Sequence, residues 1–175
     1  MSHQDDFQRE VTAYHEAGHA VIAYMLRYKP ISATIVPAHD ANGAVKYQSP
    51  LRGLRLDVDV TDRTRWKLEH AIIISFAGPL AQRKFKEHAW RDYHGTFDFQ
   101  EIERLSLRAV GSSAQATAFT HWLEITTLEM VDNHWTKIER VAKLLHQRER
   151  LSGAEIASAL RVNDPAQIKV TDDDQ

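Results

Sequence analysis

The sequence predicts a mainly α-helical domain with one small β-hairpin in its N-terminal half. Apolar residues recur at three- and four-residue steps over most of the chain, and one short region alternates with β-branched residues instead. The chain has 175 residues, 43% of them hydrophobic, and no cysteine, so it can bury a full core without disulfides. We expect one domain over residues 1–168 and a flexible acidic tail over residues 169–175.

The N-terminal part is expected to form a long helix followed by the hairpin. Apolar residues follow the helical period over residues 7–27, and Lys29-Pro30 ends the helix because proline restricts the residue before it to extended conformations. An alternating, β-branched strand is expected over residues 31–36 and a second strand over residues 44–47. Residues 40–43 between them are typical of a turn. Two strands cannot form a core alone, so this hairpin must lie against helices.

The remaining elements are expected to be helices. Thr61 or Asp62 is a candidate N-cap for the second helix, and Gly78-Pro79 indicates a break or bend before the helix resumes to about residue 85. A third helix is expected from residue 97 or 98 to near residue 111. Apolar steps over residues 115–147 indicate one long helix or two, and a capping pattern around Ser152 begins a short last helix.

The segment 14–22 contains the pattern His-Glu-x-x-His, formed by His15, Glu16 and His19. Two residues four apart lie on one face of a helix, so both imidazoles can point at one metal ion. Glu16 is rotated by about 100° from His15, so its carboxylate can reach a water on the metal without being a ligand. Chance would produce such a pattern roughly 0.04 times in a chain of this composition. Gly18 inside this helix indicates that another group approaches the backbone there.

Two histidines leave a zinc ion one protein ligand short. A catalytic zinc site has three protein ligands and one open position for water. Because the chain has no cysteine, the third ligand must be a histidine or a carboxylate, and the residues alone leave many candidates. The His-rich extension of the metzincins is absent after His19.

Composition argues against several classes of partner. A net charge of −2 with ten histidines gives no electrostatic case for binding nucleic acid or an anionic membrane. Residues 1–6 lack the basic and apolar regions of a signal peptide. The longest apolar run, Ala71 to Ala81, is about half the length of a membrane span. We therefore expect a cytoplasmic protein that binds neither nucleic acid nor membranes.

The segment from Tyr14 to Val21 closely resembles the zinc-binding helix of the FtsH-type peptidases, the M41 family of ATP-dependent zinc proteases. The similarity continues in order from about Val11 to Leu160. The other matching segments are Ile31 to Pro37, Asn42 to Val45, Ala77 to Ala81, Gly95 to Asp98 and Leu144 to Ile156. The resemblance implies a helical zinc-peptidase domain with a C-terminal helical bundle.

The resemblance also implies roles for individual residues. His15 and His19 become zinc ligands, Asp98 becomes the third ligand, and Glu16 becomes the general base. A carboxylate near the start of a helix is stabilised there by the helix dipole, although an ordinary N-cap would also place Asp98 at that position. His94 and Asp92 are the alternative third ligands.

Three features depart from the family pattern. We expect neither the membrane segments nor the ATPase module that precede this domain in the family, because the zinc-binding helix is expected to begin by about residue 7. Gln82 stands where relatives usually have glutamate, which puts a contact around the metal site in doubt. Phe97 replaces the asparagine before the third ligand, so the local loop is expected to differ.

The resemblance leads us to expect a zinc metalloendopeptidase whose substrates are peptides or unfolded protein segments. In relatives the sheet edge pairs with substrate, so residues 44–47 are the candidate substrate edge. A folded protein resists unfolding by about 5–15 kcal/mol, so folded targets would need a separate unfoldase partner. The alternative is a zinc-binding regulatory or protein-interaction module with little hydrolysis. The sequence does not define the oligomeric state.

Overall fold

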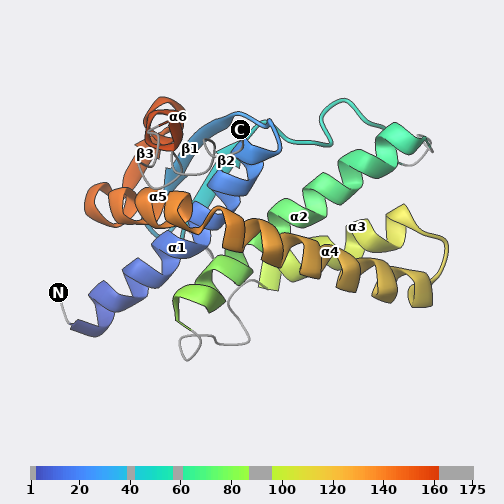
Figure 1. Cartoon of the computed structure of the whole chain (residues 1–175), viewed down its shortest axis with the longest axis horizontal. Coiled ribbons are helices and arrows are strands. Elements are labelled where there is room, and N and C mark those ends of the chain that lie inside the picture. The colour runs from blue at the N-terminus through green and yellow to red at the C-terminus, as the bar shows by residue number, and fades with distance from the viewer. Residues whose placement is uncertain (1–2, 39–41, 57–60, 87–95, 162–175) are drawn as a thin grey trace, which may run out of the picture.

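The computed structural model describes residues 3–38, 42–56, 61–86 and 96–161. Its helices and strands are α1 (His3–Met25), β1 (Pro30–Thr34), β2 (Ala44–Tyr47), α2 (Asp62–Phe85), α3 (Thr96–Ala109), α4 (Ser113–Asn133), α5 (Trp135–Arg148), β3 (Arg150–Ser152) and α6 (Gly153–Arg161) (Figure 1). The fold is mainly α with a small antiparallel sheet, so the predicted fold class is confirmed. The expected tail over residues 169–175 and the end of the expected domain at residue 168 lie outside the described residues.

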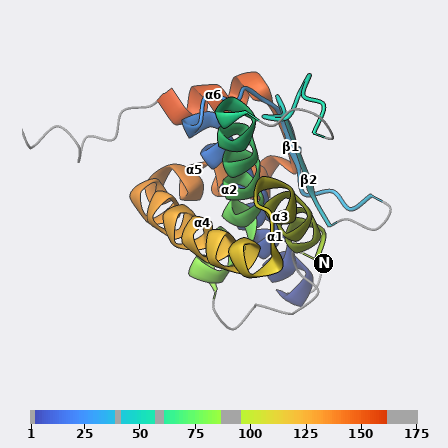
Figure 2. The same ribbon diagram turned by 90° about the vertical axis from the view of Figure 1, so that its right-hand side faces the viewer.

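The packing of α1 on α2 forms the centre of the fold, and α3 and α4 lie side by side against α2 (Figures 1 and 2). The two backbones approach closely where α1 carries Gly18. A Cβ atom at Gly18 would lie 2.4 Å from the carbonyl oxygen of Ala77 on α2. The presence of Gly18 predicted that another group approaches the backbone of α1 at this point. This prediction is confirmed, and the group is the backbone of α2.

The sequence predicts a break or a bend at Gly78-Pro79. Helix α2 continues through both residues, so the break is wrong, and the bend stays a prediction. Proline inside a helix costs about 3 kcal/mol. Burying a large apolar side chain stabilises the fold by about 1.5–3 kcal/mol, and Ile72, Ile74 and Phe76 are all buried on this stretch of α2. Tertiary packing therefore outweighs the local cost. Gly78 also has no Cβ to collide with the proline ring that follows it.

The three strands form an antiparallel sheet in the order β2-β1-β3, with Ala33 of β1 opposite Val45 of β2 and Leu151 of β3. The predicted hairpin is confirmed, and its second strand has the predicted bounds. The sequence did not predict β3, because three residues are too few to show an alternating pattern. Strand β2 lies at one edge of the sheet and contacts α1.

The predicted helix boundaries differ from the observed ones by a few residues at most places. Helix α1 begins four residues earlier than expected, and Thr61 is confirmed as the N-cap of α2 because its side chain accepts from the N–H of Thr64. The region 115–147 forms two helices, which separate at His134. Before α6, the N–H and Oγ of Ser152 bond to Glu155 Oε2 at 2.8 and 2.7 Å, which is the expected capping arrangement.

None of the helices within the described ranges combines the length and the apolar character needed to cross a membrane.

Candidate metal centre

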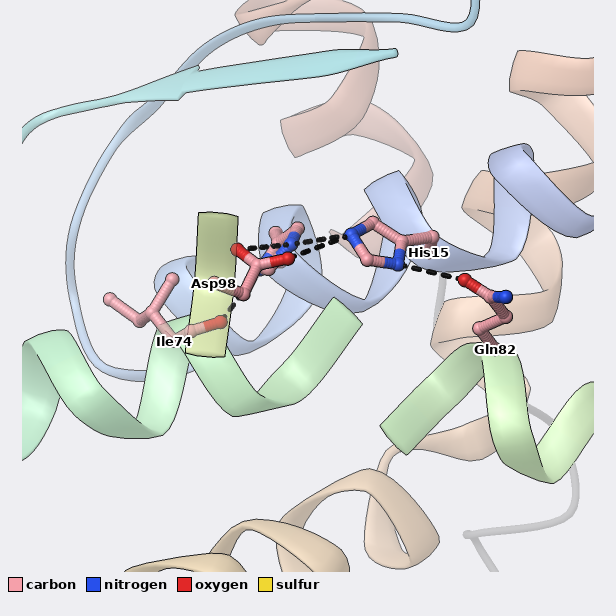
Figure 3. Close-up of polar contacts among 5 residues, drawn as sticks. His15, Ile74, Gln82 and Asp98 are labelled. Atoms are coloured by element: carbon pink, nitrogen blue, oxygen red, sulfur yellow. Dashed lines mark hydrogen bonds and ion pairs between the residues drawn. The ribbon is translucent and has the colours of Figure 1, made fainter. Parts of the chain in front are cut away.

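The side chains of His15, His19 and Asp98 converge at one point between α1 and α3, with one potential ligand atom from each within 4.8 Å of the others (Figure 3). The two imidazole Nε2 atoms are 3.1 Å apart. Asp98 places Oδ2 3.2 Å from Nε2 of His15 and Oδ1 3.4 Å from Nε2 of His19. The first turn of α3 thus brings a carboxylate to the two histidines of α1.

These separations fit a tetrahedral zinc ion. Zinc binds imidazole nitrogen and carboxylate oxygen at about 2.0–2.2 Å, so neighbouring corners of the tetrahedron are separated by about 3.3–3.5 Å. The distance of 3.1 Å between the two Nε2 atoms is close to that spacing, and so are the distances of 3.2 and 3.4 Å from the two imidazoles to different oxygens of Asp98. Two nitrogens and one oxygen leave a fourth corner for water or substrate, which is the donor set of a catalytic zinc site.

His19 is held at its other ring nitrogen by the backbone of α2. Its Nδ1 donates to the carbonyl oxygen of Ile74 at 2.7 Å, which leaves Nε2 to face Asp98. The ring is buried, and it fills the space beside Gly78, where a Cβ atom would lie 2.2 Å from Nε2 of His19. Helix α2 therefore fixes both the orientation and the position of this ring.

His15 is held from the same helix by a side chain. Its Nδ1 donates to Oε1 of Gln82 at 3.0 Å, and its ring lies between Gln82 and Asp98 (Figure 3). Gln82 is 2% exposed. The sequence left a contact at this position in doubt because an amide replaces a carboxylate. The structure shows that the amide oxygen makes a contact with His15.

The cluster needs a positive charge at its centre. Both Nδ1 atoms donate outward, so the Nε2 lone pairs of His15 and His19 would repel each other unless a proton or a metal ion lies among them. Burial opposes charging of His19, but the Asp98 carboxylate outweighs it and raises the pKa of His19 to about 9. Burial would raise the pKa of Asp98, but the two imidazoles lower it overall. A metal ion would take the place of that shared proton.

Glu16 lies beside the cluster without joining it. Its side chain is buried, and burial raises the pKa of its carboxyl group, although His15 and His19 oppose the shift. The carboxyl group lies against Gly43, just before β2, where a Cβ atom would be 2.6 Å from Oε1. Glu16 is thus placed between the histidine pair and the edge of the sheet.

Among the described residues, the three potential ligands brought together are the three that the resemblance implied. The alternative third ligands, His94 and Asp92, lie outside the described residues. Sequence reasoning did not identify the Ile74 carbonyl oxygen, because a backbone acceptor has no residue signature. It also did not identify Gly43 and Gly78 as residues whose missing side chains make room for Glu16 and His19.

Comparison with known proteins gives a weak similarity to a zinc metalloprotease. The chain is 24% identical over 199 residues to the ATP-dependent zinc metalloprotease FtsH of Streptobacillus moniliformis, and the alignment covers 95% of this chain and 28% of that protein. The chain therefore spans under a third of the length of this relative. No family model matches the chain. The similarity supports an FtsH-like relationship and, at a coarse level, a protease-like function.

Proposed function

We propose that this chain is a zinc-dependent metalloendopeptidase that cleaves peptides or unfolded protein segments and that needs no ATP for this cleavage. The observation that carries the proposal is the placement of one potential ligand atom each from His15, His19 and Asp98 within 4.8 Å of one another, with the buried Glu16 next to the histidines on α1. The similarity to a zinc metalloprotease supports the choice of metal and reaction. The M41-type assignment of the domain belongs to the same proposal.

His15, His19 and Asp98 would hold the zinc ion in this proposal. When bound, zinc lowers the pKa of a water molecule toward about 7 and polarises a carbonyl group. Glu16 accepts the proton of the attacking water and returns it to the amine that leaves. Its burial supports this role, because burial raises the pKa of the carboxyl group and so makes it a stronger base.

The open edge of β2 is the proposed substrate-binding strand. Strand β1 pairs with one side of β2, and the other side is the edge of the sheet. Gly43, which precedes this strand, touches Glu16, so an extended peptide paired with β2 would pass close to the base. Only a segment that is already extended can add to an edge in this way. We therefore propose peptides and unfolded segments as substrates, with a separate unfoldase partner for folded targets.

The Glu16→Gln variant tests the proposed reaction. The amide keeps the size of the side chain but cannot accept the proton, so we expect zinc binding to remain and peptide cleavage to be lost. Cleavage is measured with fluorogenic peptides and with one protein offered folded and unfolded. His15→Ala is the control and should lose most of the zinc. Turnover by Glu16→Gln at the wild-type rate would refute the role of Glu16.

A zinc-binding interaction module with little hydrolysis is the second candidate. It is favoured by the exposed side chains of Trp122, Ile125 and Leu128, which lie three residues apart on α4 and could contact another protein. In that case the wild type would bind zinc without cleaving any peptide, and Glu16→Gln would behave like the wild type.

Three further predictions belong to this proposal. We propose that residues 1–168 form one domain, since a single core of described residues extends from Ala13 on α1 to Leu160 on α6. A cytoplasmic location stays a prediction. The expected absence of nucleic-acid and membrane partners also stays a prediction.

A further inference from the structure

Gly43 and Glu16 occupy one small space between β2 and α1. A Cβ atom built on Gly43 would lie 2.6 Å from Oε1 and 2.9 Å from Cγ of Glu16, and 2.9 Å from Cγ2 of Thr12. Non-bonded carbon and oxygen atoms do not approach this closely without repulsion. The carboxyl group of Glu16 therefore lies in space that is free because residue 43 has no side chain.

The backbone conformation does not require glycine at this position. Among the described glycines, positive φ is found at Gly53 and not at Gly43. An alanine at position 43 would therefore meet a steric conflict and no backbone strain. The requirement for glycine comes from the neighbouring side chains.

The elements on both sides of Gly43 are fixed by pairing and packing. The residues after it pair with β1, with Ala44 opposite Thr34 and Val45 opposite Ala33. On α1, Ala13 and Ala17 on either side of Glu16 are fully buried. The side chain of Glu16 can rotate more easily than either backbone can shift. A methyl group at position 43 would therefore move the carboxyl group first.

We propose that Gly43 is a positioning residue that sets where the carboxyl group of Glu16 lies. This inference rests on the proposed function, in which Glu16 is the base. The atoms that a Cβ at Gly43 would meet belong to Glu16 and Thr12, whereas a Cβ at Gly78 would meet His19. Gly43 thus determines the position of the proposed base, and Gly78 determines the position of a proposed metal ligand.

The first test is the Gly43→Ala variant, with Gly111→Ala as the matched control. A Cβ at Gly111 would make an ordinary contact of 3.7 Å with Gln115, so the control should behave like the wild type. Gly43→Ala should lower kcat by about tenfold or more and leave zinc affinity and KM unchanged. An unchanged kcat, or a loss of zinc together with kcat, would overturn the proposal.

A second test keeps the inference separate from the proposed function. Stability to urea is measured for the full chain as purified and for the Gly43→Ala, Glu16→Ala and doubly substituted variants. Truncating Glu16 removes the atoms that collide with the new methyl group, so the loss of stability caused by Gly43→Ala should be smaller in the Glu16→Ala background. This coupling should be present even if the wild type shows no cleavage. Additive effects of the two substitutions would overturn the inference.

Discussion

The histidines and the aspartate of the candidate metal centre come from regions of different character. At the contact of α1 with α2, His19 is buried, and there is no room for a Cβ atom at two glycines. A Cβ atom at Gly18 would meet the backbone of α2 at Ala77, and one at Gly78 would meet the ring of His19. Asp98 lies on α3, where the neighbouring residue Phe97 has an exposed fraction of 67%. Each histidine is held from behind by α2, whereas Asp98 contacts the imidazoles themselves. The α1–α2 contact therefore sets the geometry of the site, and α3 adds the negative charge.

Removing that charge should have the largest effect on metal binding. Asp98→Asn keeps the size of the side chain in the first turn of α3, but it removes the anionic ligand. Loss of a residue that hydrogen-bonds to a metal ligand lowers metal affinity by about 10- to 100-fold. Removing the charge of the ligand itself should therefore lower zinc affinity by about 100-fold or more. Zinc affinity is measured by competition with a chelator.

The control for Asp98→Asn is Glu101→Gln, one turn further along α3. This carboxylate pairs with Arg104 rather than with the histidines, so its loss should leave zinc affinity unchanged. If Asp98 were only a helix cap, both variants would bind zinc like the wild type.

Displacing the ring of His19 should have the next largest effect. In Gly78→Ala, the new Cβ would lie 2.2 Å from Nε2 of His19, the nitrogen that faces Asp98, so the ring must leave its position. We expect zinc affinity to fall by about 10- to 100-fold, and the free energy of unfolding to fall by about 1–3 kcal/mol because the space is already filled. Chelator competition and urea denaturation measure the two effects. Wild-type zinc affinity in a folded Gly78→Ala variant would show that the position of His19 does not determine binding.

The contact between Gln82 and His15 should have a smaller effect. Gln82→Leu has a similar size but leaves the partly buried Nδ1–H of His15 without this acceptor, so zinc affinity should fall by about tenfold. Gln82→Glu keeps an acceptor and adds negative charge near the metal, so it should bind zinc at least as tightly as the wild type. Equal affinities in the wild type and Gln82→Leu would mean that this contact does not orient His15.

A pH effect on stability should be the smallest, and the group responsible is His70, one turn before Ile74 on α2. Burial lowers the pKa of His70, whose Nδ1 is 3.0 Å from the Tyr28 hydroxyl. The unfolded chain then binds a proton at His70 more readily than the folded chain. The contribution of neutral His70 to the free energy of unfolding is therefore complete above about pH 6.5 and is lost as the pH falls below it. His70→Gln should unfold in urea with a smaller pH dependence than the wild type. Its zinc affinity at neutral pH should not change, and an unchanged pH dependence would contradict the assignment.

The sequence predicted the parts of the molecule that have a local signature. The period of α1, the N-cap at Thr61 and the strand β2 follow from residue types and spacing. Most of the turn expected over residues 40–43 lies outside the described residues. The continuity of α2 through Pro79 does not, because it depends on burial by other elements. The pairing of β3 with β1 is likewise a contact between distant segments.

The candidate site shows the same division. The spacing of His15 and His19 indicates a metal site on a helix, whereas no spacing links Asp98 to them, and only the family resemblance pointed to it. The roles of the Ile74 carbonyl oxygen and of the spaces at Gly43 and Gly78 arise from the packing of α1 against α2 and β2. These contacts are properties of the assembled fold and have no pattern in the sequence.

X-ray absorption at the zinc edge tests the central claim most directly. The full chain is titrated with zinc, and the spectrum is compared with those of His15→Ala and Asp98→Asn prepared in the same way. We predict about one zinc ion per chain in the wild type, bound by two imidazole nitrogens and by oxygen, with one imidazole lost in His15→Ala. Failure of the wild type to take up zinc would contradict the account, and so would a zinc spectrum that both substitutions leave unchanged.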